Sequence, residues 1–402
     1  MTAKPNLSSG RSYLAIPGPS VMPDAVLRAM HRAAPNIYAG ELPDMMPKLV
    51  QDLRRVAGTA DNVAMYIGNG HATWEAALAN VITPGDQVLV ASTGRFAHGW
   101  AETARALGAS VQMIEFGMHA PLDPDQIETA LRADTDGRIK AVMAVHVDTS
   151  TSIKSNIRDL RGAIDAAGHP ALLMVDCIAS LGCDPFLMDD WGVDVMVAAS
   201  QKGLMVPPGM GFVFFSDKAA RHRAARAGVS PYWDWAPRAA PGEFYQYWCG
   251  TAPTHHLYGL RAALDMIHDE GLTQVWARHA RLAEAVWAAC ESWQEGGALN
   301  LNVPNRAHRS AAVTALSMAP PMATRLRNWT ERKLGLTLGI GLGMAPPDDP
   351  AWHGFFRLGH MGHVNGHMIL GLIGGIEAGM TALAVPHGGK GTAAAAAVIA
   401  GV

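Results

Sequence analysis

Short apolar runs alternate along the first half of the chain with longer segments whose apolar residues recur at helical spacing. Runs that are rich in β-branched residues predict buried strands, and the segments between them predict helices. Such runs occupy 63–68, 87–92, 110–116, 140–147, 171–176, 194–199 and 209–216. Strands that alternate with helices form a mostly parallel sheet covered by helices. The pattern therefore predicts an α/β fold with one large seven-stranded sheet.

The alternation stops near residue 217, where loops rich in Pro, Trp and Tyr follow. A long stretch of helical composition after these loops predicts one helix that links two domains. Shorter apolar runs beyond it predict the strands of a smaller α+β domain at 311–318, 337–340 and 355–360. The predicted units are an N-terminal arm (1–20), a large cofactor-binding domain (21–254), the linking helix (255–293) and a small C-terminal domain (294–402).

Composition narrows the classes of function. Of 402 residues, 49% are apolar and 17% charged, which predicts a globular protein. Lys and Arg number 32 against 35 Asp and Glu, so we expect no nucleic acid and no membrane as partner. The chain shows neither a signal-peptide core nor an apolar run near the ~20 residues of a membrane span, which predicts a cytoplasmic protein acting on small molecules. The four cysteines form no CxxC pair, which predicts free thiols and no zinc site.

Three predicted strands end in residues suited to one cofactor. The first leads through Asn69-Gly70-His71 into a helix, a turn that directs N–H groups at an anion such as phosphate. The second ends in Asp176, and a buried carboxylate there needs a cation or a strong donor. The third precedes Lys202, which in an apolar pocket has a lowered pKa and can form a Schiff base. Carboxyl ends of parallel strands meet at one sheet edge, so Asp176 and Lys202 together predict a pyridoxal phosphate site.

The chain resembles the class V aminotransferases within fold type I of the pyridoxal phosphate enzymes, and among them the glyoxylate aminotransferases. The resemblance covers nearly the whole chain and is most specific in GNGHATWEAAL, VDCIASLG, SQKGLMVPPG and FRLGHMG. It implies that Lys202 forms the Schiff base with pyridoxal 5'-phosphate and that Asp176 pairs with the pyridinium nitrogen. The backbone amides of Gly70 and His71 would bind the phosphate.

The resemblance implies further cofactor contacts. Phe96 would stack on the ring, Thr149 would contact the ring hydroxyl, Ile178 would lie beside the ring and Gln201 would bond the phosphate edge. Thr251 lies where the neighbouring subunit reaches across to the phosphate, which implies a homodimer.

Substrate residues are predicted in two places. Arg357 lies among apolar residues, and its planar fork suits a substrate carboxylate. The resemblance places Asn36 and Tyr38 in a loop where glyoxylate aminotransferases carry a polar pair, so both are predicted substrate contacts. His360 and His363 lack a third ligand of suitable spacing, which predicts no metal site.

The chain departs from the family pattern at several positions. Ser152 replaces the glycine of a Ser-Thr-Gly loop, which leaves that loop's backbone path open. The pyridoxamine–pyruvate type carries an acidic residue where Asn69 stands and a second arginine where Leu342 stands. Neither feature is present, and their absence weakens the interpretation that free pyridoxamine is a substrate.

The leading interpretation is an aminotransferase that moves an amino group from a small amino acid, alanine or serine, to a 2-oxo acid such as glyoxylate or pyruvate by a ping-pong mechanism. A pyridoxamine–pyruvate aminotransferase is the first alternative. A cysteine desulfurase or lyase would need a reactive loop cysteine, and no cysteine follows Cys290. A noncatalytic cofactor-binding protein would require neither Lys202 nor Asp176.

Overall fold

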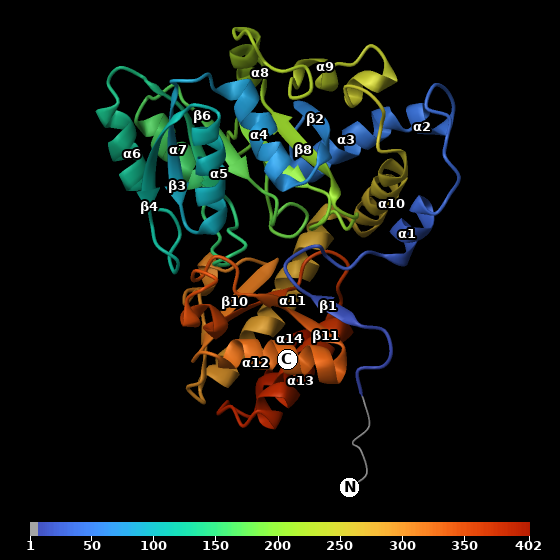
Figure 1. Cartoon of the computed structure of the whole chain (residues 1–402), viewed down its shortest axis with the longest axis vertical. Helices are drawn as coiled ribbons and strands as arrows, with labels where there is room; N and C mark the ends of the chain where they lie inside the picture. Colours follow the sequence, from blue (N-terminus) through green and yellow to red (C-terminus); the bar gives the residue numbers. More distant parts are fainter. Residues whose placement is uncertain (1–6) are drawn as a thin grey trace.

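The computed structural model describes residues 7–402, which form two β-sheets one above the other (Figure 1). The larger sheet has the strand order β2-β8-β7-β6-β5-β3-β4. Its strands are β2 (Asn62–Gly68), β3 (Gln87–Ser92), β4 (Ser110–Glu115), β5 (Ile139–Val145), β6 (Leu172–Asp176), β7 (Val195–Ala199) and β8 (Gly209–Phe215). Strand β8 runs antiparallel to β2 and β7, and the other pairs are parallel. The predicted seven-stranded, mostly parallel sheet is confirmed.

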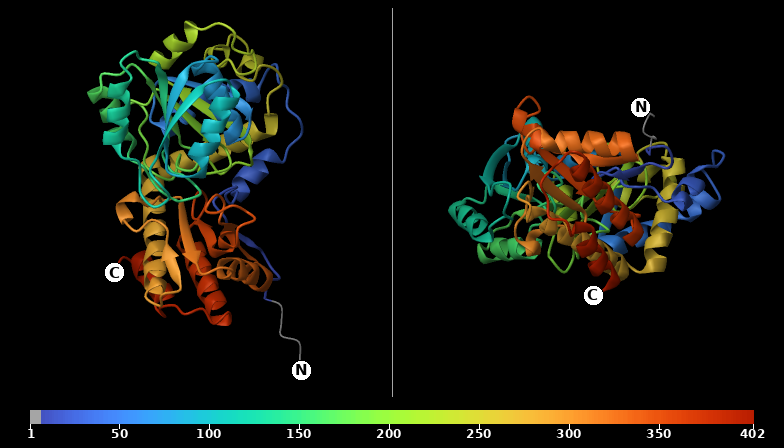
Figure 2. Two further views of the ribbon diagram at one scale, coloured as in Figure 1. Left: turned by 60° about the vertical axis from the view of Figure 1, so that its left-hand side comes forward. Right: turned by 90° about the horizontal axis from the view of Figure 1, so that it is seen from below.

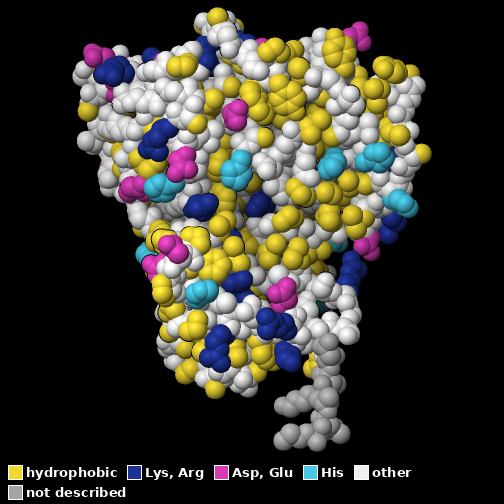
Figure 3. Space-filling model, in the orientation of Figure 1, with side chains coloured by type: hydrophobic (Ala, Val, Ile, Leu, Met, Phe, Trp, Pro, Cys, Tyr) yellow, Lys and Arg dark blue, Asp and Glu magenta, His cyan; other side chains and the backbone are white. Residues whose placement is uncertain are grey.

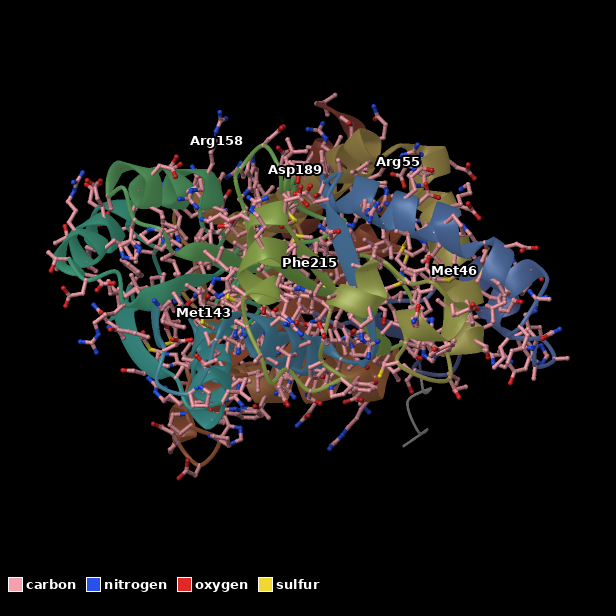
Figure 4. The ribbon with its side chains drawn as sticks, turned by 90° about the horizontal axis from the view of Figure 1, so that it is seen from above. Met46, Arg55, Met143, Arg158, Asp189 and Phe215 are labelled. Carbon is pink, nitrogen blue, oxygen red and sulfur yellow. The ribbon has the colours of Figure 1, made fainter. Side chains whose placement is uncertain are left out.

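Helices cover both faces of this sheet. One face packs against α4 (Gly70–Val81), α5 (Arg95–Ala106) and α8 (Asp217–Ala224). The other face packs against α3 (Met46–Ala57), α6 (Pro124–Ala133), α7 (Ile157–Ala166) and α10 (Thr254–Glu270). Burial on two faces explains why β6 and β7 are buried at every position and contain no apolar–polar alternation. Seen from above, Met143 and Phe215 lie in this interior, whereas Arg158 and Asp189 lie at its outer edge (Figure 4).

The smaller sheet contains two short strands that the sequence pattern did not predict, β1 (Tyr13–Ala15) and β9 (Leu299–Leu301). Its order is β1-β11-β12-β10-β9, and its other strands are β10 (Val313–Met318), β11 (Leu336–Ile340) and β12 (Phe355–Gly359). The helices around it are α12 (Met322–Leu334), α13 (Gly366–Ala382) and α14 (Gly391–Ala400). Strand β1 pairs in parallel with β11, so the start of the chain joins the lower part of the molecule (Figure 2). The segment after β1 then crosses to the large sheet and leads to α1 (Asp24–Met30).

The single linking helix predicted over 255–293 is wrong. The segment forms two helices, α10 and α11 (Leu272–Gln294), which meet at Gly271. Gly271 has φ +84°, a left-handed conformation that ends α10. One glycine within strong helical composition gives too weak a signal to predict this break.

Short elements complete the described residues. They are α2 (Glu41–Asp44), α9 (Ala236–Ala239) and the 3₁₀ turns η1 (Phe244–Tyr247), η2 (Arg306–His308) and η3 (Pro350–Gly354). No helix within 7–402 combines the length and the apolar character needed to cross a bilayer.

A buried carboxylate joins α3 to α10. Asp52 on α3 accepts hydrogen bonds from Lys48 Nζ at 2.7 Å and from Arg261 Nη2 of α10 at 2.7 Å. Burial acts to raise the pKa of Asp52, but these two donors outweigh it and hold the pKa below its ordinary value. The charged form of Asp52 therefore helps to hold the two helices together.

We expect Asp52→Asn to destabilise the fold by about 3 kcal/mol at pH 7, because it leaves Arg261 without its buried partner. Asp265→Asn is the matched control, since Asp265 also contacts Arg261 but is 51% exposed, and it should cost less than about 1 kcal/mol. Denaturant unfolding measures both values. The loss caused by Asp52→Asn should shrink as the pH falls through the lowered pKa of Asp52. Equal losses for the two variants would contradict the prediction.

Candidate active site

One cavity at the carboxyl ends of β5, β6 and β7 collects most of the predicted cofactor contacts. Its lining consists of Gly70, His71, Trp74, Phe96, Val145, Val147, Thr149, Asp176, Ile178, Gln201 and Lys202. The helix starts of α4 and α5 provide two of its walls. This position agrees with the rule that ligands of open α/β sheets bind outside the carboxyl ends of the strands.

Asp176 is the last residue of β6, and its carboxylate is buried. Each carboxylate oxygen accepts one hydrogen bond: Oδ1 from the Ile178 amide at 2.7 Å and Oδ2 from Trp74 Nε1 at 2.7 Å. Burial raises the pKa of Asp176 to about 7, although both bonds act in the opposite direction. A cationic donor beside this carboxylate would restore its charged form.

Trp74 is a site residue that the sequence analysis did not single out. It is buried on α4, with its ring 4.5 Å from that of His71 and 6.2 Å from that of Phe96. Trp74 therefore contacts three residues that are predicted to bind the cofactor, namely Asp176, His71 and Phe96. It stands inside GNGHATWEAAL, but helical periodicity there also fits a core tryptophan, so the sequence alone did not reveal the bond to Asp176.

Lys202 follows β7 and its Nζ donates a hydrogen bond to the Pro17 carbonyl. Burial, with a smaller effect of the Arg357 charge, lowers the pKa of Lys202 to about 8. Gly18 has φ +95°, and a Cβ there would lie 2.5 Å from Lys202 Nζ. Only glycine fits at this position. The segment IPGPS thus reaches the site from the smaller sheet, a role that the sequence analysis did not assign.

The start of α4 is capped by its own asparagine. Asn69 Oδ1 accepts hydrogen bonds from the amides of His71 at 3.1 Å and Ala72 at 3.3 Å. The predicted phosphate contact of the His71 amide therefore competes with this cap. Burial lowers the pKa of the His71 side chain, and the nearby charges of Arg95 and Lys202 lower it further.

Arg357, on β12, is not one of the residues that line this cavity, but it contacts Thr149, which does. It is buried, and it donates from Nε to the Ile340 carbonyl at 2.6 Å and from Nη1 to the Thr149 carbonyl at 2.8 Å. Burial lowers the pKa of Arg357 to about 10. Ser152, in the loop after Thr149, adopts φ +62°, so it keeps the left-handed conformation that the glycine of the family pattern would favour.

The structure does not bring every predicted site residue to the cavity. Asn36 and Tyr38 lie in an exposed loop, where Tyr38 is 88% exposed, and Thr251 is also exposed. None of the three lines the cavity. Their predicted contacts thus depend on a neighbouring subunit or a different loop position.

Other cavities and side-chain clusters contain fewer of the predicted functional residues. A larger cavity of about 1110 Å³ lies between the segment before α1 and helix α13, and no predicted site residue lines it. Across residues 7–402, no group of three or more His, Cys, Asp or Glu side chains is placed to hold a metal ion. His360 instead hydrogen bonds to Thr314 Oγ1 at 2.9 Å, as a buried structural histidine does.

Comparisons with known proteins agree with this geometry. The chain is 38% identical over 378 residues to a serine–glyoxylate aminotransferase of Methylorubrum extorquens, covering 92% of this chain and 90% of that protein. It is 33% identical to an L-aspartate–glyoxylate aminotransferase of Paracoccus denitrificans, covering 94% of each. A crystal structure of ureidoglycine–glyoxylate aminotransferase from Bacillus subtilis superimposes with a TM-score of 0.86 at 26% identity, covering 97% of this chain and 98% of that one.

The family model "Aminotransferase class-V" matches residues 13–326. This range includes β1, the whole larger sheet, Asp176 and Lys202. The predicted family and fold type are confirmed by the model and by these relatives together. The chain belongs to the class V aminotransferases and is a pyridoxal phosphate-dependent transaminase.

Proposed function

We propose that this transaminase moves an amino group from a small amino acid, alanine or serine, to glyoxylate or pyruvate. The observation that carries the proposal is the placement of Lys202 and Asp176 at the ends of adjacent strands, both lining one cavity. The relatives that are named for glyoxylate support this acceptor. The pyridoxamine–pyruvate alternative lacks its second arginine here, because Leu342 stands at that position.

The residues of the cavity fit pyridoxal 5'-phosphate. Asp176 is a buried carboxylate in need of a cationic donor, which a protonated pyridine nitrogen provides. Gln201 lines the same cavity, and its amide nitrogen Nε2 would be the atom that donates to a phosphate oxygen. Bound in this way, the cofactor supplies an electrophilic aldehyde and a ring that accepts electrons.

Each side chain of the site has a separate proposed role. Lys202 would provide the amine that holds the cofactor covalently, and the same amine would accept and return a proton. The Pro17 carbonyl accepts a hydrogen bond from that amine and orients it. Asp176 would pair with a protonated ring nitrogen, and Phe96, which lines the same cavity, would contact the ring. Arg357 fixes the substrate carboxylate, since two backbone carbonyls have already oriented its guanidinium.

A homodimer is part of the proposal. Thr251 and Tyr38 are exposed in the single chain, and exposed apolar side chains are concentrated over the upper part of the molecule (Figure 3). Ile67 and Tyr245 are among the large apolar residues exposed in the larger unit. A second copy that packed against these residues would cover them and bring Thr251 to the neighbouring site.

The desulfurase alternative finds no support in the cysteines. Cys177, Cys183 and Cys290 are buried. Burial raises the pKa of Cys290 far above its ordinary value, which opposes a nucleophilic thiolate. Cys249 is exposed, but it does not line the cavity.

Replacing Lys202 by Ala should abolish covalent attachment of pyridoxal 5'-phosphate and lower turnover by orders of magnitude, because the amine is lost. Borohydride reduction followed by mass spectrometry measures the attachment. Lys333→Ala, on the exposed side of α12, is the control. In the wild-type apoprotein the rate of attachment should rise with pH through about 8, since only the neutral amine attacks. Cofactor fixed to the Lys202→Ala protein would refute the assignment.

Trp74→Phe keeps the aromatic packing but removes the N–H that donates to Asp176. Because this bond favours the charged carboxylate, its loss should raise the pKa of Asp176 above about 7 in the apoprotein. Affinity for pyridoxal 5'-phosphate should fall by about 10-fold near neutral pH, from a loss of roughly 1.5 kcal/mol, and recover at higher pH. Equilibrium titration across the pH range measures it.

Trp100→Phe is the matched control for this prediction. Trp100 stacks on Trp74, but its indole nitrogen has no hydrogen-bond partner within the described residues. The two variants remove the same N–H group, and only one of these groups reaches Asp176. A pH-independent loss of affinity in Trp74→Phe, or equal losses in both variants, would show that Trp74 merely packs.

Arg357→Lys should reduce kcat/KM in both half-reactions, because a lysine cannot keep bonds to two carbonyls and also present a planar fork to the substrate. Arg357→Ala should cost about 2 to 4 kcal/mol in activation free energy, or roughly 30- to 1000-fold. Stopped-flow measurement of the donor and acceptor half-reactions is the test. If only the 2-oxo acid half-reaction slows, the amino donor has no carboxylate that contacts Arg357. An amine such as pyridoxamine is then favoured as the donor over alanine or serine.

A further inference from the structure

An exposed arginine at the start of α5 has no assigned role. Arg95 precedes Phe96, which lines the cavity, and its backbone amide donates to Ser150 Oγ at 3.1 Å. Its side chain is exposed, and within residues 7–402 its guanidinium forms neither an ion pair nor a hydrogen bond. Several other exposed arginines, by contrast, pair with a carboxylate, as Arg132 does with Glu128 at 2.7 Å.

Two independent contacts place Arg95 beside Arg357. The first is the loop after β5, where Ser150 binds the Arg95 amide and the adjacent Thr149 carbonyl binds Arg357 Nη1. Both arginines are thus anchored to consecutive residues of one loop.

The second contact is the loop after β11. A Cβ built on Gly343 would lie 2.5 Å from Arg95 Cβ and 2.7 Å from its Cδ, so the side chain of Arg95 packs directly on this glycine. Three residues earlier in the same loop, the Ile340 carbonyl binds Arg357 Nε. Gly343 has φ +80° and no side chain, which leaves the space that Arg95 uses.

Three cationic side chains and one carboxylate lie around this position. Besides burial, Arg95 and Lys202 both lower the pKa of His71, which lines the cavity, so the charge of Arg95 acts at the cavity wall. Arg357 adds a second guanidinium, and the buried Asp148 carboxylate, which accepts a hydrogen bond from the Phe96 amide, offsets part of this positive charge. The Arg95 guanidinium itself has no partner within residues 7–402, and a guanidinium binds a carboxylate well.

We propose that Arg95 binds the side-chain carboxylate of a dicarboxylic amino donor, with L-aspartate as the probe, while Arg357 holds its α-carboxylate. This inference rests on the proposed function and widens its donors beyond alanine and serine. The neutral side chain of alanine gains nothing from Arg95. The predicted effect is therefore a selectivity for aspartate over alanine that depends on one guanidinium.

The test compares donor half-reactions of the holoenzyme by single-turnover spectroscopy with L-aspartate and L-alanine. Arg95→Gln should lower the ratio of kcat/KM for aspartate over that for alanine by at least about 10-fold, as expected for loss of a partly exposed charged hydrogen bond. Arg105→Gln is the matched control, because Arg105 is exposed in the last turn of the same helix. It should leave the ratio unchanged.

The outcomes separate this inference from the proposed function. If the wild-type enzyme converts alanine or serine but not aspartate, the inference is wrong and the proposed function stands. If it converts no amino acid, the proposed function fails, and the inference fails with it. If Arg95→Gln lowers both donors equally, or weakens equilibrium binding of pyridoxal 5'-phosphate, Arg95 serves the cofactor and the inference is overturned.

Discussion

The buried carboxylate of Asp176 is the constraint on which the rest of the site depends. A charge at the end of a strand that is buried on both sides is costly unless donors meet it, and Ile178 and Trp74 supply one hydrogen bond to each oxygen. These two bonds hold the carboxylate in one orientation. Burial still raises its pKa to about 7, so a cationic donor beside this carboxylate would stabilise its charged form. The proposed contact with a protonated ring nitrogen rests on this property.

The same low-dielectric interior determines the state of Lys202. Burial lowers its pKa to about 8, and the nearby Arg357 acts in the same direction. A buried amine that is easily deprotonated is a good nucleophile near neutral pH. The Pro17 carbonyl accepts one hydrogen bond from the amine, and Gly18 leaves the room for it. The smaller sheet thus influences the chemistry through the chain that leads from β1.

The two arginines proposed to bind the substrate, Arg357 and Arg95, differ in their physical surroundings. Arg357 is buried, and its orientation is fixed by two backbone carbonyls. Arg95 is exposed and packs its aliphatic part on Gly343, so its charge is screened but free to meet a ligand. A guanidinium held in one orientation suits the α-carboxylate, which all amino-acid substrates share. A guanidinium that can change its orientation suits the side-chain group, by which these substrates differ.

Apolar runs of six to eight residues identified all seven strands of the larger sheet, and burial on both faces explains why the central strands β6 and β7 have no exposed positions. Strand ends also placed Asp176 and Lys202 at one sheet edge, since the carboxyl edge of a parallel sheet is determined by strand direction alone. Strands β1 and β9 escaped prediction because three residues carry no periodicity, and the break at Gly271 escaped because one glycine is a weak helix terminator. The bond between Trp74 and Asp176, the contact of Lys202 with Pro17 and the proximity of Arg95 to Arg357 join residues that are 102 to 262 positions apart in the chain. Such pairs depend on how sheets and helices pack, and only the tertiary structure determines that packing.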